Sequence, residues 1–137
     1  MLSQQQAKQV VSSYGAGSVS TVTPAALVLM LFDGALRFIA RAEYGFEHEA
    51  LSRRNEEVHN NLTKARAILR ELQVSLNMEA AGEFPGQMFA LYDFMIDQLL
   101  AADIRKEKGP IQNVAGLLSD IREAWAEMLR KFQSEGG

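Results

Sequence analysis

The sequence predicts an all-α protein, an antiparallel four-helix bundle with a loosely docked N-terminal arm. No stretch of useful length alternates apolar and polar residues, as a strand with one buried face would. Apolar residues instead recur every three or four positions along four long segments, which is the spacing of one helix face. The three prolines, at positions 24, 85 and 110, stand where three of these segments begin, and proline suits the first turn of a helix. A length of 137 residues favours one domain with a sizeable core.

Residues 1–22 differ in composition from the rest and are expected to form the arm. They are rich in Gln, Ser, Thr and Gly, with few apolar side chains, and residues 4–13 could make a short helix that the following glycines end. Tyr14 is the natural anchor, because its ring is large and apolar while its hydroxyl can stay hydrated. Two roles stay open: the arm covers the groove of the bundle (23–137) and competes with a partner, or it clamps the bound partner.

Four helices of similar length are expected after the arm. Thr23 is a suitable N-cap for the first and Pro24 its first helical residue. The second has one clean apolar seam that includes Leu69, which should therefore be buried. Short connections between helices of this length indicate antiparallel neighbours. The expected ranges are 23–49, 52–76, 85–106 and 110–133.

The first and third helices carry more apolar surface than a bundle needs. One apolar stripe per helix is enough to build the core. A second stripe on each must be covered or left exposed, and exposed apolar patches usually mark binding sites. The cover could be the arm, a second copy of the chain, or a partner that lies in the grooves as helices. The expected partner-binding residues are Leu29, Phe32 and Leu36 on the first helix, Phe89, Ile96 and Leu100 on the third, and Tyr14 of the arm.

The sequence offers little support for catalysis or for a metal site. There is no cysteine, so thiolate ligands and disulfides are excluded. Glu56 and His59 form one E-x-x-H motif, whereas ferritin-like di-iron bundles use two such motifs with further carboxylates. We therefore expect both side chains to be solvated, and we expect no catalytic residue, no metal and no cofactor.

Charge and hydropathy limit the partners further. The formal net charge is −3 and no basic patch stands out, which argues against nucleic acid. The longest apolar run, 25–32, is far shorter than the roughly 20 residues that span a membrane. The N-terminus lacks the apolar core of a secretory signal peptide, so a cytoplasmic location is expected.

Residues 13–39 contain a tyrosine, Tyr14, then V-S-T-V-T-P, then L-V-L-M-L-F-D-G-A-L-R-F, which ends at Phe38. This order closely resembles the opening of the FliS family of flagellar secretion chaperones, which shows a tyrosine, V-x-T-x-T-P and L-x-x-M-L-Y/F-D-G-A-L-x-F. The resemblance continues in N-L-T-K-A-R-A-I-L-R-E-L (61–72), L-Y-D-F-M (91–95) and L-L-S-D-I-R-E-A-W (117–125). It departs from the family at Asp103, where Ala-Asn is usual, and in the segment 82–88.

The resemblance implies a cytoplasmic export chaperone that is not an enzyme. Such proteins bind the C-terminal segment of flagellin, prevent its premature polymerisation and deliver it to the flagellar type III export apparatus, without ATP or a cofactor. An export-gate component or an anti-sigma factor would be further partners. The alternatives from other classes are a ferritin-like metal-binding bundle and a self-associating structural bundle.

Overall fold

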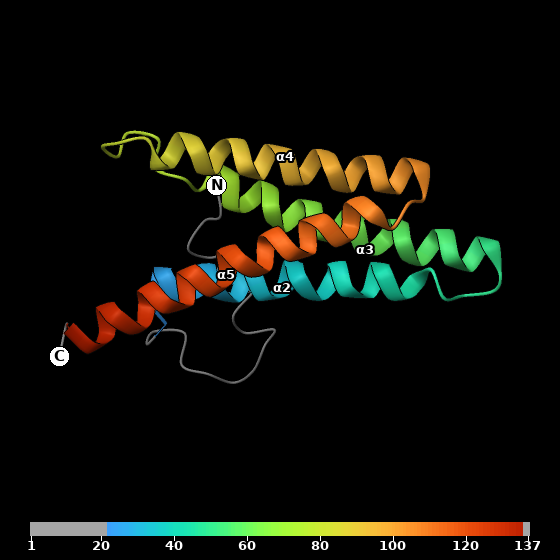
Figure 1. Cartoon of the computed structure of the whole chain (residues 1–137), viewed down its shortest axis with the longest axis horizontal. Helices are drawn as coiled ribbons and strands as arrows, with labels where there is room; N and C mark the ends of the chain where they lie inside the picture. The colour runs from blue at the N-terminus through green and yellow to red at the C-terminus, as the bar shows by residue number, and fades with distance from the viewer. Residues whose placement is uncertain (1–21, 136–137) are drawn as a thin grey trace.

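The computed structural model describes residues 22–135, which fold into four α-helices (Figure 1). They are α2 (Pro24–Gly45), α3 (Leu51–Val74), α4 (Phe84–Arg105) and α5 (Gly109–Glu135). No strand occurs within this range, so the prediction of an all-α fold is confirmed. The expected arm, with Tyr14, lies outside the described residues apart from Val22.

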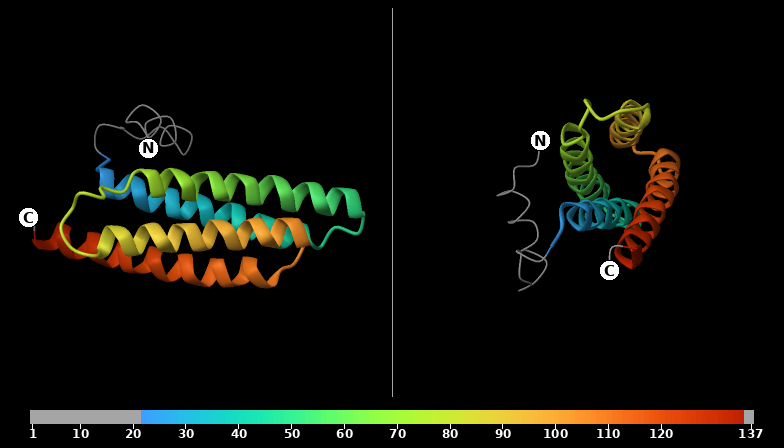
Figure 2. Two further views of the ribbon diagram at one scale, coloured as in Figure 1. Left: turned by 90° about the horizontal axis from the view of Figure 1, so that it is seen from above. Right: turned by 90° about the vertical axis from the view of Figure 1, so that its left-hand side faces the viewer.

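Consecutive helices run antiparallel around a shared core. α2 packs against α3 and α5, and α4 packs against the same two helices from the other side (Figure 2). α2 and α4 begin at one end of the bundle, where α3 and α5 finish. α4 and α5 diverge toward this end, and α5 projects beyond its neighbours (Figures 1 and 2). We call this end the open end and the opposite one the closed end.

Local chemistry explains where α2 begins and ends. The Thr23 hydroxyl accepts a hydrogen bond from the backbone N–H of Ala26 at 3.1 Å, with Pro24 in the first turn, as expected. The helix ends at Gly45, about one turn earlier than predicted. A Cβ at Gly45 would lie 3.2 Å from the Cβ of Glu57 and 3.3 Å from a methyl of Val58, so glycine allows α3 to turn back tightly here.

α4 also ends at the closed end of the bundle, but its C-cap has a different conformation. Lys106 adopts a left-handed conformation with φ of 52°, which ends the helix at Arg105, one residue before the predicted end. The backbone N–H of Glu107 then returns to the carbonyl of Ala102 at 3.1 Å.

The core is made by one continuous apolar cluster that all four helices share. Leu69 is fully buried, which confirms the single-seam prediction for α3. The largest fully buried apolar side chains are Phe32, Ile39, Val58, Leu62, Leu69, Met95, Leu99, Ile111, Val114 and Leu118.

Candidate partner-binding site

An apolar cavity of about 420 Å³ lies at the open end, where all four helices contribute to its walls. Its position follows from the divergence of α4 and α5, which leaves their facing side chains too far apart to close the core. None of the residues that line it carries a charge. They are Val28 and Phe32 of α2; Leu72, Ser75, Leu76 and Asn77 at the end of α3; Phe84, Met88 and Tyr92 of α4; and Ile121, Ala124, Trp125 and Met128 of α5.

Two aromatic side chains form the fixed wall of the cavity. The rings of Phe32 and Trp125 meet edge to face with centroids 6.2 Å apart. The indole N–H of Trp125 donates to the carbonyl of Ala25 at 2.8 Å, which ties α5 to the first turn of α2. Tyr92 faces the same space, and burial raises the pKa of its phenol, so it stays neutral.

The rim of the cavity is exposed and apolar. Phe84 is 57% exposed and Met128 46%, and Ala124, which also lines the cavity, is exposed as well. Methionine adapts its shape to different apolar partners. This arrangement can accept aliphatic or aromatic side chains of a polypeptide, and no charged side chain lines it.

The residues that the sequence predicted as partner-binding do not share one surface. Leu29 and Leu36 are half-buried on α2, and Phe89 and Leu100 are exposed on α4. Phe32 and Ile96 were placed on surface stripes, and this placement is wrong, since they are 1% and 6% exposed. A bundle helix with two neighbours buries a wide arc, and both residues lie inside that arc. Phe32 still lines the cavity, whereas Ile96 belongs to the core.

The cavity itself was missed by the sequence reasoning. By periodicity, Trp125 and Met128 belong to the single apolar stripe of the last helix, a pattern that indicates ordinary core. A signal was available, because that stripe continues to Phe132, which is 74% exposed on the projecting end of α5. Apolar residues that run beyond the neighbouring helices have no core to enter and must face solvent or a partner.

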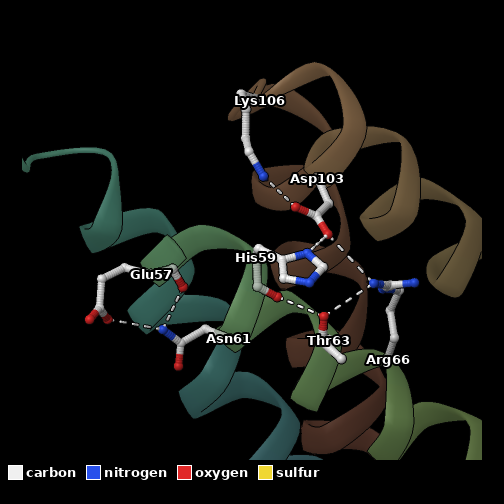
Figure 3. A network of polar contacts seen from close by, with 7 residues as sticks. All are labelled: Glu57, His59, Asn61, Thr63, Arg66, Asp103 and Lys106. Carbon is white, nitrogen blue, oxygen red and sulfur yellow. Dashed lines mark hydrogen bonds and ion pairs between the residues drawn. The ribbon is translucent and has the colours of Figure 1, made fainter. Parts of the chain in front are cut away.

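A polar cluster ties α3 to α4 at the closed end (Figure 3). The buried carboxylate of Asp103 contacts Nδ1 of His59 at 2.7 Å, Nζ of Lys106 at 2.5 Å and a guanidinium nitrogen of Arg66 at 3.5 Å. The expectation that His59 is only solvated is therefore wrong, although its side chain is 58% exposed. In the range 22–135, no group of three or more His, Asp or Glu side chains is placed to hold a metal ion.

The cluster favours the ionised form of Asp103. Burial alone would raise the pKa of this carboxyl, but the hydrogen bonds and positive charges of Lys106 and then His59 outweigh it and hold the pKa below its usual value. The cluster is thus a structural tie between helices.

The fold and the cavity define a class: a four-helix bundle with an uncharged apolar cavity at one end. The family model described as "Flagellar protein FliS" matches residues 6–131. The chain is 37% identical over 124 residues to the flagellar secretion chaperone FliS of Bacillus subtilis (strain 168), covering 90% of this chain and 89% of that protein. It is 36% identical over 115 residues to the protein of the same name from Salmonella typhimurium, covering 83% and 82%. The chain belongs to the FliS family.

None of the four helices within residues 22–135 is both long enough and apolar enough to cross a bilayer.

Proposed function

We propose that this protein is a flagellar secretion chaperone that binds the C-terminal segment of flagellin in the cytoplasm, prevents premature polymerisation and delivers it to the type III export apparatus. The relatives named as flagellar secretion chaperones support the role. The observation that carries the proposal is the uncharged cavity with its exposed apolar rim at the open end. An export-gate component or an anti-sigma factor would contact the loaded chaperone as a further partner.

The mechanism we propose is folding of the flagellin segment on the chaperone. A disordered amphipathic segment places apolar side chains into the cavity and becomes helical as it does so. The ordering cost offsets part of the contact energy and keeps the complex reversible, as delivery requires. Leu29 and Leu36 on α2 and Phe89 and Leu100 on α4 do not line the cavity, but they are exposed or half-buried, and a longer flagellin segment would extend the contact to them. No step needs a cofactor or a catalytic residue.

The arm, residues 1–22, is proposed to cover the cavity until flagellin displaces it. Support comes from its attachment, because α2 begins at the open end and Trp125 holds the carbonyl of Ala25 beside the cavity. A tethered segment has a high effective concentration at a nearby site. Removal of residues 1–18 should then strengthen flagellin binding. If the truncation and Tyr14→Ala both weaken binding instead, the arm clamps the partner.

The site can be tested with a signal that the chain itself supplies. Trp125 is the single tryptophan and lines the cavity, so a C-terminal flagellin peptide should change its fluorescence. Ala124→Asp places a charge in the mouth and should weaken binding by roughly tenfold or more, as desolvating a carboxylate is costly. Ala67→Asp, at an exposed position of α3 away from the cavity, is the matched control. Equal binding by both variants would contradict the proposed site.

A further inference from the structure

A second surface runs along the outer side of α4, away from the core. It consists of Phe89, Asp93, Asp97, Leu100 and Ile104, which we call the α4 stripe. At 100° per residue these five positions fall within an arc of about 80°. Phe89 is 37% exposed, Leu100 39% and Ile104 74%, so three large apolar side chains face outward on one helix. Within residues 22–135, all three remain at least one-third open to solvent.

Two carboxylates interrupt this apolar stripe at its middle. One oxygen of Asp93 accepts a hydrogen bond from the side-chain amide of Gln73 at 2.7 Å and lies 3.4 Å from the guanidinium of Arg70. Asp97, one turn further, is exposed and forms no hydrogen bond or ion pair with any residue of the described range. Even with Arg70 counted, the stripe therefore presents an excess of negative charge between two apolar ends.

The geometry points to a specific occupant: we propose that the α4 stripe binds an amphipathic helix that carries two basic side chains about one turn apart, with aliphatic residues on both sides of them. The aliphatic residues would cover Phe89 at one end and Leu100 and Ile104 at the other. The two basic side chains would pair with Asp93 and Asp97. Asp97 would gain the larger stabilisation, because it has no ion-pair partner in the described range. This inference rests on the proposed function, because the helix is assigned to the flagellin segment that the chaperone carries.

A second copy of this chain does not fit the same surface. A two-fold axis at the middle of the α4 stripe would bring Asp93 and Asp97 of both copies together, and these four carboxylates outnumber the two Arg70 guanidiniums beside them, so the two copies repel each other. An anionic membrane surface is disfavoured for the same reason. Charge complementarity thus selects a basic helix over the other candidates for this apolar face.

The experiment uses the full-length protein and two synthetic helical peptides of about 20 residues, a length that spans the stripe. Both carry leucines facing Phe89, Leu100 and Ile104; one carries two lysines facing Asp93 and Asp97, and its twin carries two glutamates. Binding is measured by fluorescence anisotropy of the labelled peptides. The variants are Asp97→Lys and, as a matched control with the same charge change on the outer face of α5, Asp120→Lys.

We expect the lysine peptide to bind the wild-type protein roughly tenfold more tightly than the glutamate twin, the sum of two modest ion pairs. Asp97→Lys should abolish or reverse this preference, while Asp120→Lys should preserve it. High salt should reduce the difference, since exposed charges are screened. Equal binding of the two peptides, or a preference that survives in Asp97→Lys, overturns the inference.

A flagellin C-terminal peptide in the same assay separates this inference from the proposed function. If flagellin fails to bind the wild-type protein, the proposed function fails, and with it the assignment of the helix to flagellin. If flagellin binds wild type and Asp97→Lys equally, the chaperone function stands and the inference is wrong. A loss of roughly tenfold in Asp97→Lys alone supports both.

Discussion

The two ends of the bundle are built on opposite principles. At the closed end, Gly45 lets α3 approach α2 tightly, Leu99 and Ile111 are fully buried, and Asp103 ties α4 to α3. At the open end, α4 and α5 diverge and leave an apolar cavity of about 420 Å³ with an exposed rim. The closed end is held together by polar contacts as well as by core packing, whereas the cavity at the open end is lined only by uncharged residues.

This difference separates stability from binding. A surface that must accept a partner has to keep apolar groups uncovered, which weakens local packing. A well-packed region elsewhere in the same core can compensate, because the helices run the full length of the bundle. Changes at the closed end should therefore act on folding, and changes at the open end should act on the partner.

The largest expected effect distinguishes core from surface within α4. Ile96→Asp would bury a carboxylate in the core and should cost on the order of 4 kcal/mol or unfold the protein. Leu100→Asp, one turn away and 39% exposed, should change the free energy of unfolding by less than about 1 kcal/mol. Urea melts followed by circular dichroism measure both. A folded Ile96→Asp variant would show that this side of α4 is surface.

A matched pair of leucines tests the two ends directly. Leu99→Ala at the closed end should cost about 2–5 kcal/mol, because a fully buried side chain leaves a cavity. Leu76→Ala at the open end should cost about 1–2 kcal/mol, since the residue is half-buried beside space that already exists. Comparable losses would show that the open end is as tightly packed as the closed end.

The polar cluster around Asp103 predicts that the stability of the protein depends on pH. Asp103→Asn should lower the stability at about pH 7 by about 1–3 kcal/mol, as hydrogen bonds to a charged group are lost. The native pKa of Asp103 lies below its usual value of 3.8, so its contribution is present above that value and is lost as the pH falls through the native pKa. The gap between wild type and variant should close in acid. A gap that stays constant from about pH 7 to about pH 3 would exclude this role for the charge.

The smallest effect concerns His59. Its side chain is 58% exposed although Asp103 is buried, and Lys106 also pairs with Asp103, so His59→Ala should cost less than about 1 kcal/mol. Glu56→Ala, its neighbour in the E-x-x-H motif, has no such bond and should cost less than about 0.5 kcal/mol. A larger loss of stability for Glu56→Ala than for His59→Ala would mean that His59 does not help to hold α3 and α4 together.

Part of the candidate site could be predicted from sequence and part could not. The surplus of apolar residues on the first and third helices indicated a binding surface, and Phe89 and Leu100 are indeed exposed on α4. Periodicity gives an angle around one helix but not the position of its neighbours. It therefore could not show that Ile96, only a small rotation away from Phe89, is covered by the bundle.

By itself the sequence determined the all-α class, four helices with nearly correct bounds, the Thr23 cap and the burial of Leu69, because these depend on interactions within a turn or along one helix face. The similarity of residues 13–39 to the FliS family was also visible in the sequence. Only the tertiary structure decided that Trp125 and Met128 face a cavity and that His59 meets Asp103, 44 positions away. Such features depend on how far apart two helices lie, and that distance is set by packing of the whole bundle.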